Sequence, residues 1–270
     1  MAVIGRSGVR TGGGSRPRGY RSRVDAPDPP RPDARILIAL EACPSTQDVV
    51  REQALQGAPA GMACTAEHQT AGRGRRGRTW TETPGTALMF SYLARPARPP
   101  SELGPLPLVV GIALAEALPL GPRLRWPNDL VLRDHKLGGV LAELATPPDG
   151  APFAVIGVGI NANLTAAQLP PTDRLPATSL LVEGGAPVDR AALRGRLLEA
   201  LDEALAVFDR DGFAAFAGRW AALDDLAGRP LELRLPDRAV TGRCDGVDAE
   251  GRIVVGGEAY AAGEVERVLG

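Results

Sequence analysis

The sequence predicts an α+β protein, in which a mixed β-sheet with flanking helices is followed by a small C-terminal β-barrel. Three observations indicate this class. Segments with strand and helix patterns follow one another through most of the chain, and from about residue 227 short apolar runs alternate with tight turns. The hydrophobic fraction of 44% over 270 residues is enough for a large core, which must consist mainly of aliphatic side chains because aromatic residues make up only 4%.

The first 34 residues are expected to form a disordered tail. They are rich in Gly, Pro and Arg, lack apolar periodicity, and contain no apolar stretch long enough for a signal peptide. The first strand is predicted over 35–41. A helix follows, with Ser45 as its expected N-cap, Asp48 three residues later and Gly57 as the stop signal.

The remaining elements follow from hydrophobic periodicity. The helix over 189–208 is the clearest, because its leucines at spacings of four residues and Phe208 fall on one face. The whole pattern divides the chain into a tail (1–34), a large domain (35–225) and a small β-rich domain (226–270). Strands are predicted over 62–68, 86–94, 123–126, 129–132, 136–145 and 153–164, and further helices over 105–118 and 212–223.

Cysteine content and charge exclude several classes of function. Cys43, Cys64 and Cys244 are odd in number and form no CxxC pair, so neither a disulfide framework nor a zinc site is predicted, and a reducing cytoplasm fits best. No apolar run reaches the roughly 18 residues that span a bilayer. The net charge is −1 overall but −5 after residue 34, which argues against a general nucleic-acid-binding surface.

One lysine, Lys136, stands among 30 arginines. It is either a chance survivor of an arginine-rich composition or a position where a guanidinium cannot serve. A lysine ammonium is a compact point charge on a flexible stem, whereas arginine is a planar fork. A tight site in which one cation lies between negative oxygens would therefore require lysine.

A second concentration of charge is the loop "HQTAGRGRRGRTW" over 68–80. Its glycines allow close approach of the backbone to a ligand, and its arginines offer paired donors to phosphate or carboxylate oxygens. Such a loop suits a mobile lid over a polyanion, with Trp80 at its edge. An RNA-binding tract or a solvated connection has a similar composition, and no Walker A motif occurs.

Four motifs in order decide between these readings: "GRGRRGRTW", "RWPNDL", "KLGGVLAE" and "GVGIN". Together they resemble the biotin–protein ligases, and the β-rich end fits the SH3-like C-terminal domain of that family. The resemblance implies ATP-dependent formation of biotinyl-5′-adenylate and pyrophosphate. Biotin is then transferred to a lysine of a biotin carboxyl carrier domain of a carboxylase. ATP and Mg²⁺ are the implied cofactors, and no metal-binding residue is assigned.

The resemblance also implies roles for individual residues, which form three groups. The catalytic group is Lys136, Arg75 and Asp129, where Lys136 contacts both the biotin carboxylate and the phosphate, and Asp129 orients the acceptor lysine. The ATP and adenylate group is Arg75, Arg78, Trp80, Asn128, Lys136 and Asn161. The biotin group is Ser45, Thr46, Gln47, Gln69, Gly72, Arg73, Gly74, Arg75 and Lys136.

The chain departs from the family at one motif position, where Arg125 replaces a usual lysine, so that position is expected to need only a cation. Some relatives carry an N-terminal DNA-binding domain. Because only the tail precedes Ile36, no sequence-specific DNA binding is predicted. The alternatives are a lipoate or octanoate ligase of the same fold, a nucleic-acid-binding module that uses the arginine loop, and an inactive biotin-binding regulator.

Overall fold

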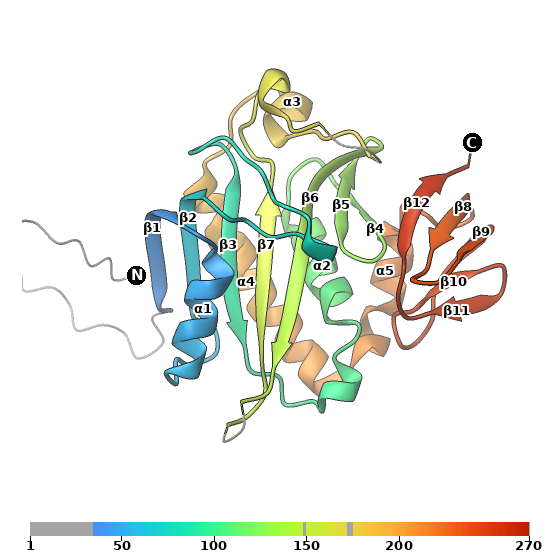
Figure 1. Cartoon of the computed structure of the whole chain (residues 1–270), viewed down its shortest axis with the longest axis horizontal. Coiled ribbons are helices and arrows are strands. Elements are labelled where there is room, and N and C mark those ends of the chain that lie inside the picture. Colours follow the sequence, from blue (N-terminus) through green and yellow to red (C-terminus); the bar gives the residue numbers. More distant parts are fainter. Residues whose placement is uncertain (1–34, 148–149, 172–174, 270) are drawn as a thin grey trace, which may run out of the picture.

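A computed structural model describes residues 35–147, 150–171 and 175–269, and shows two β-sheets side by side with helices packed on the larger one (Figure 1). The expected tail over 1–34 lies outside the described residues. The larger sheet has the strand order β1-β2-β3-β7-β6-β5-β4. Its strands are β1 (Leu37–Cys43), β2 (Ala63–Gln69), β3 (Leu88–Ala94), β4 (Arg123–Arg125), β5 (Asp129–Leu132), β6 (His135–Ala145) and β7 (Phe153–Ile160).

The larger sheet is mixed, as predicted. Strands β1 and β2 run parallel, joined by helix α1 (Thr46–Leu55), and every other neighbouring pair is antiparallel. A parallel pair needs a crossover connection, which α1 provides. The helix places its N-terminus at the end of β1, and this position becomes important for the site.

Helices cover both faces of the larger sheet. Helix α1 packs over β3 and β7 on one face, while α2 (Leu106–Ala117) and α4 (Arg190–Asp211) pack against each other and the opposite face. The long apolar α2 is buried almost throughout, which explains why its sequence is hydrophobic on all sides. Two short helices, α3 (Leu180–Gly184) and α5 (Ala217–Leu223), complete this part of the fold.

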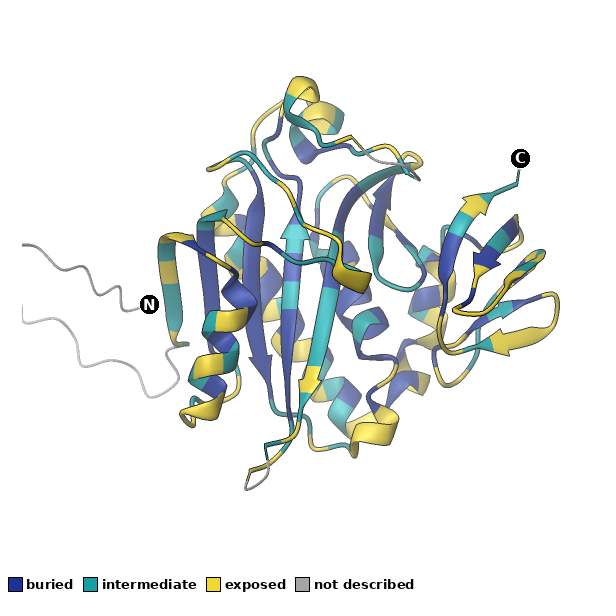
Figure 2. Cartoon of the chain, viewed as in Figure 1, coloured by how far each residue is buried: buried dark blue, intermediate teal, exposed yellow. Residues whose placement is uncertain are grey.

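The core is aliphatic and lies mainly between the sheet and helices α2 and α4. A smaller cluster under α1 contains Val50, Met62, Leu93 and Phe153, all with at most 1% of their surface exposed. Figure 2 shows β2 and β3 buried along most of their length, whereas much of β9 and β11 is exposed. The larger sheet is thus well packed and can hold the side chains of a site in fixed positions.

The second sheet is the SH3-like C-terminal barrel that the sequence predicted, with the strand order β11-β10-β9-β8-β12. Its strands are β8 (Pro230–Arg234), β9 (Ala239–Val247), β10 (Ile253–Val255), β11 (Glu258–Tyr260) and β12 (Glu264–Val268). The Trp126 indole N–H donates to the Gly251 carbonyl in this region (3.1 Å). The segment that leads into β8 is held to β4, because Arg125 binds Asp225 and Leu124 bridges to Asp224.

Some local expectations need correction. Ser45 occupies the N-cap position of α1, but its side chain makes no capping hydrogen bond. The helix predicted over 212–223 begins as a 3-10 turn over Phe213–Phe216, and neither α3 nor β11 was predicted. The three cysteines are free and buried. Among the described helices, none combines the length and the apolarity needed to cross a membrane.

Candidate active site

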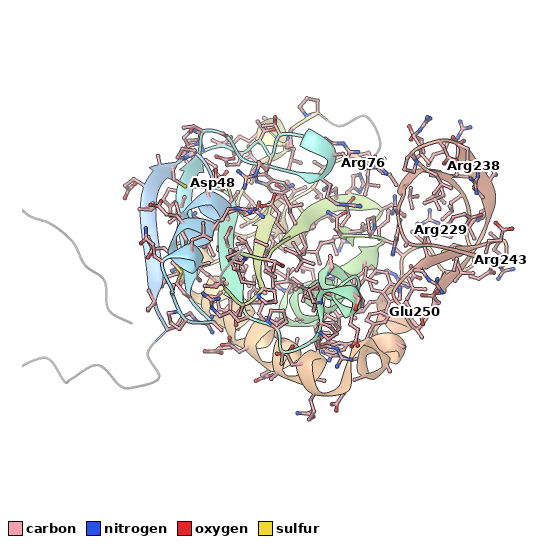
Figure 3. The ribbon with its side chains drawn as sticks, turned by 60° about the horizontal axis from the view of Figure 1, so that its bottom comes forward. Asp48, Arg76, Arg229, Arg238, Arg243 and Glu250 are labelled. Atoms are coloured by element: carbon pink, nitrogen blue, oxygen red, sulfur yellow. The ribbon has the colours of Figure 1, made fainter. Side chains whose placement is uncertain are left out.

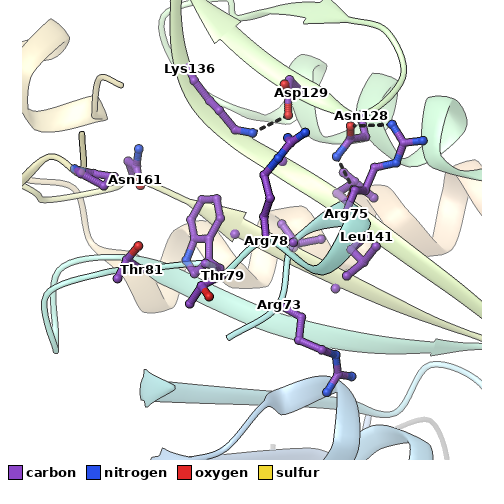
Figure 4. A pocket seen from close by; sticks show the side chains of 18 of the residues that line it. Arg73, Arg75, Arg78, Thr79, Thr81, Asn128, Asp129, Lys136, Leu141 and Asn161 are labelled. Atoms are coloured by element: carbon purple, nitrogen blue, oxygen red, sulfur yellow. Dashed lines mark hydrogen bonds and ion pairs between the residues drawn. The ribbon is translucent and has the colours of Figure 1, made fainter. Parts of the chain in front are cut away.

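A cavity of about 460 Å³ lies on the α1 face of the larger sheet, at the loop between β2 and β3 (Figure 4). Residues of β12 also line it. It brings together residues from all four sequence motifs and from the start of α1. Gly72 does not line it. The predicted site residues that do are Ser45, Thr46, Gln47, Gln69, Arg73, Gly74, Arg75, Arg78, Trp80, Asn128, Asp129, Lys136 and Asn161.

One end of the cavity is a fixed polar wall at the N-terminus of α1. Ser45, Thr46 and Gln47 are all at most 4% exposed. The Thr46 backbone N–H donates to Gln69 Oε1 at 2.8 Å, and the Thr46 hydroxyl shares a 2.8 Å hydrogen bond with Ser91. These contacts tie the helix start to β2 and β3, so the wall is ordered before any ligand binds.

The arginine loop is closed on itself at the cavity mouth. The Gly74 N–H donates to the Arg78 carbonyl (2.7 Å), and the tip turns at Arg76 and Gly77, both in the left-handed region with φ of 55° and 73°. At its base the Trp80 N–H donates to the Gly72 carbonyl, and a Cβ on Gly72 would lie 2.7 Å from the Trp80 carbonyl oxygen. Gly72 therefore shapes the loop from behind the cavity.

The loop arginines contact carboxylates from distant parts of the chain. Arg73 binds Asp48 of α1 at 2.7 Å. Arg78 forms an ion pair with Glu264 of β12, and Arg76 lies 3.7 Å from the same carboxylate. In Figure 3, Asp48 lies over the β1–β2 side and Arg76 lies toward the C-terminal sheet. The loop is therefore held at both ends, by α1 and by β12.

Arg75 differs from its neighbours because its contact is a neutral side chain, the Oδ1 atom of Asn128 at 3.4 Å. Burial lowers the pKa of Arg75, since the loss of water around the guanidinium outweighs the attraction of Glu264 and Asp129. A desolvated cation in a cavity is a strong anchor for an anion. Within the described residues Arg75 is not ion-paired, unlike Arg73 and Arg78, so an anionic ligand group can take this position without displacing a carboxylate.

Lys136 lies near the start of β6 and directs its ammonium group into the cavity (Figure 4). Its Nζ atom is 2.6 Å from Asp129 Oδ1 on β5. Its backbone is held on both sides, because its N–H donates to the Pro176 carbonyl (2.7 Å) and its carbonyl accepts from Thr178 N–H (2.9 Å). The ammonium group can therefore move on its flexible stem while the backbone stays fixed.

Two glycines of "GVGIN" give the cavity a smooth floor on β7. A Cβ on Gly159 would lie 2.7 Å from the Trp80 ring, and a Cβ on Gly157 would lie 2.8 Å from the Gln47 side chain. Trp80 and Gln47 thus rest directly on the backbone of β7. The indole N–H of Trp80 is buried without a hydrogen-bond partner among the described residues.

The two asparagines occupy different positions along the cavity. Asn128 is fixed through its amide N–H to the Val140 carbonyl (2.9 Å) and through Arg75. Asn161 donates to the Thr178 carbonyl (2.9 Å), but its Oδ1 atom is buried without a partner among the described residues. A buried acceptor with an unmet hydrogen bond at a cavity wall suits a donor group of a ligand.

Apart from Asp129, sequence reasoning missed the acidic residues around the cavity. Glu264 and Glu266 of β12 line it, and Asp48 and Glu143 hold Arg73. The contact between Arg78 and Glu264 joins residues 186 positions apart in the sequence. No local pattern signals such a partner, because it depends on how the C-terminal sheet packs against the larger sheet.

Comparisons with known proteins agree with this geometry. Residues 39–161 match the biotin/lipoate A/B protein ligase family. The biotin–[acetyl-CoA-carboxylase] ligase of Mycobacterium tuberculosis is 35% identical over 245 residues, which cover 86% of this chain and 88% of that protein. A solved structure of the Aquifex aeolicus biotin protein ligase in complex with biotin and ATP aligns with a TM-score of 0.74 and 30% identity, covering 85% of this chain and 97% of that one.

The bifunctional ligase/repressor BirA of Escherichia coli is 39% identical over 199 residues, or 72% of this chain. The match spans only 61% of the length of that relative. The similarity to the mycobacterial ligase covers most of both chains, and the Aquifex enzyme has the same architecture. The chain belongs to the biotin–protein ligases of the biotin/lipoate A/B protein ligase family.

Proposed function

We propose that this protein is an ATP-dependent biotin–protein ligase that works in two steps. In the first, a biotin carboxylate oxygen attacks the α-phosphorus of ATP, the bond to the β-phosphate breaks, and biotinyl-5′-adenylate and pyrophosphate form. In the second, the amine of an acceptor lysine attacks the acyl carbon, the bond to the phosphate oxygen breaks, and AMP leaves as the amine loses a proton. The acceptor is a biotin carboxyl carrier domain.

The observation that carries this proposal is the set of cations around one preformed cavity. Arg75, Arg78 and Lys136 come from two different motifs and line the same space. The first step must bring a carboxylate and a triphosphate together, so the main barrier is repulsion between anions. Fixed cations reduce that barrier by positioning and charge neutralisation.

The remaining residues of the cavity divide between biotin and the nucleotide. We expect the polar wall at Ser45, Thr46, Gln47 and Gln69 to bind the biotin ring system, because these side chains are buried and fixed before binding. We expect the adenylate to contact Arg75, Arg78, Trp80, Asn128, Lys136 and Asn161. We expect the biotin carboxylate to contact Arg73, Gly74, Arg75 and Lys136.

We expect Asp129 to serve the second step. Its carboxylate is 2.6 Å from Lys136 Nζ, so it lies beside the group that would contact the acyl phosphate. A carboxylate there can orient the incoming lysine amine and accept its proton.

Magnesium fits this site only as part of the nucleotide. The acidic residues at the cavity already contact cations: Asp129 contacts Lys136, and Glu264 contacts Arg76 and Arg78. Over residues 35–147, 150–171 and 175–269, no group of three or more His, Cys, Asp or Glu side chains is placed to hold a metal ion. We expect Mg²⁺ to enter on the ATP phosphates, where it neutralises charge.

Pyrophosphate release tests the proposal directly. With ATP and magnesium, the protein should release pyrophosphate when biotin is supplied and not when lipoate replaces it. Mass spectrometry of an added carrier domain should then show one biotinyl group on its lysine. Release with lipoate alone would assign the protein to a lipoate ligase, and release with neither would leave a binding protein.

Arg75→Ala should weaken biotin binding by about 10–100-fold, the effect of one charge-assisted hydrogen bond in a cavity. It should leave the melting temperature nearly unchanged, because burial of this cation is unfavourable in the empty protein, as its lowered pKa indicates. Calorimetry with biotin and a thermal melt measure the two effects.

Arg95→Ala is the matched control for Arg75→Ala. Arg95 donates to the carbonyls of Ala54 and Ala58 and lies outside the cavity. It should lower the melting temperature and keep biotin affinity. A large thermal destabilisation by Arg75→Ala would show instead that the loop is a structural element.

A further inference from the structure

A second cavity, of about 250 Å³, lies between β12 and the end of the larger sheet formed by β4, β5 and the turn after β5. It shares three lining residues with the larger cavity: Asp129, Leu175 and Glu266. The two cavities therefore meet at the carboxylate that contacts Lys136. The second one reaches Asp129 from the side of the C-terminal sheet, whereas the arginine loop covers the first.

The charges of the second cavity are balanced. All three arginines of its wall have a carboxylate partner: Arg125 contacts Asp225 (2.7 Å), Arg229 contacts Asp134 (3.0 Å), and Arg267 contacts Glu232 (2.8 Å). A polyanion such as pyrophosphate therefore meets no excess of positive charge there. The lining carboxylates are paired as well, Glu266 with Arg234 at 2.7 Å and Asp129 with Lys136 at 2.6 Å. A lysine side chain, which carries a single charge, can share one of these carboxylates without disturbing the overall balance.

Three carboxylates line the second cavity and differ in exposure. The side-chain exposure falls from 68% at Asp134 to 33% at Glu266 and 14% at Asp129. Asp134 stands on the tight turn between β5 and β6, with a φ of 62°. A cationic side chain that enters past Asp134 would pass Glu266 and arrive at Asp129 beside the Lys136 ammonium.

We propose, on the basis of the proposed function, that the second cavity admits the acceptor lysine, with Asp134 and Glu266 as positioning residues at its entrance. The amine must reach an acyl carbon that lies beneath the loop, next to Lys136. A lysine side chain has a four-carbon stem that can extend through a narrow opening while its backbone stays on the surface. At Asp129 the ammonium group loses one proton, and the neutral amine attacks the acyl carbon. The bond between that carbon and the phosphate oxygen breaks, AMP leaves, and the nitrogen loses its second proton as the amide forms.

The test uses the full chain and a purified biotin carboxyl carrier domain. Asp134→Asn keeps the size of the side chain and suits the positive φ, since Asn accepts that conformation. It should lower kcat/KM for the carrier about fivefold, through KM, in line with the modest strength of an exposed charge interaction. Adding Glu266→Gln should deepen the loss, and high salt should reduce the difference from wild type.

Asp237→Asn is the matched control, because Asp237 has the same side-chain exposure of 68% and a comparable arginine contact at 3.1 Å, but lies outside both cavities. It should leave carrier kcat/KM unchanged. Biotin-dependent pyrophosphate release by Asp134→Asn should equal that of wild type. Hydroxylamine, which reaches the acyl carbon without docking, should consume the adenylate at the wild-type rate.

The outcomes separate the two proposals. If wild type releases pyrophosphate with biotin but Asp134→Asn and Asp237→Asn have equal carrier kcat/KM, the entry route is wrong and the ligase activity stands. If Asp134→Asn slows pyrophosphate release as much as transfer, the residue acts on the first step and the entry route is again wrong. If wild type releases no pyrophosphate with biotin, the proposed function itself fails, and the entry route fails with it.

Discussion

Lys136→Arg should lower the rate of biotin-dependent pyrophosphate release by about 10²–10³-fold, the loss typical of one misplaced charge-stabilising group in an active site. The charge is kept, so the loss measures geometry. The ammonium lies 2.6 Å from Asp129, and its backbone is held by Pro176 and Thr178, so the wider planar guanidinium could not occupy the same point between two anions. Single-turnover pyrophosphate release measures the step.

Arg133→Lys is the control for Lys136→Arg, because it exchanges the same two residue types three positions away, on a side chain that is 70% exposed and contacts Glu183. It should keep the wild-type rate. Biotin binding without ATP should fall less in Lys136→Arg than the rate of adenylation, because the lysine is needed most when both anions are present. A rate for Lys136→Arg within about twofold of wild type would contradict the geometric argument.

Gly138→Ala should destabilise the fold by about 2–3 kcal/mol, the usual cost of an overpacked core position. Gly138 pairs with Ile160 across β6 and β7, and a Cβ there would lie far inside van der Waals contact of the Gly159 carbonyl oxygen. Backbone cannot move aside as a flexible side chain can. Urea unfolding should show the lower stability, together with a loss of biotin binding because Gly159 supports Trp80.

The neighbouring substitution, Gly139→Ala, is the internal control. A Cβ on Gly139 would lie 3.4 Å from Asp129 Oδ1 and 3.5 Å from the Asn128 carbonyl, which are close but tolerable contacts. It should cost clearly less stability than Gly138→Ala. Equal stability of the two variants would show that β6 and β7 can separate locally, against the tight pairing described above.

Local pattern was a good guide to the regular elements and a poor one to irregular turns. The leucine spacing of α4 and the apolar runs of β6 and β7 are properties of consecutive residues, so these elements were predicted within a few positions. Helix α3 has five residues and β11 has three, too few for a period to be visible. Ser45 matched a helix cap by position, but its side chain is buried at the cavity.

In the candidate site, too, contiguous patterns were predictable and contacts between distant elements were not. The motifs supplied every cation of the cavity, because glycine-arginine and lysine-glycine patterns are contiguous in sequence. They also supplied Asp129, which contacts Lys136. The other carboxylates that meet those cations come from α1, β6 and β12, and only the packing of separate elements brings them close. Asp48 appeared in the sequence as a capping residue, whereas the structure gives it a contact with Arg73.

Those carboxylates also affect which anions can bind at the cations of the cavity. Arg73, Arg78 and Lys136 already contact Asp48, Glu264 and Asp129, so a single inorganic phosphate or sulfate must compete with a tethered carboxylate at each cation. A tethered group has a high effective concentration, which a free ion at millimolar level does not readily overcome. A ligand with several anionic oxygens can replace these carboxylates at several cations when it binds. These three ion pairs therefore weaken the binding of a single inorganic anion at Arg73, Arg78 and Lys136.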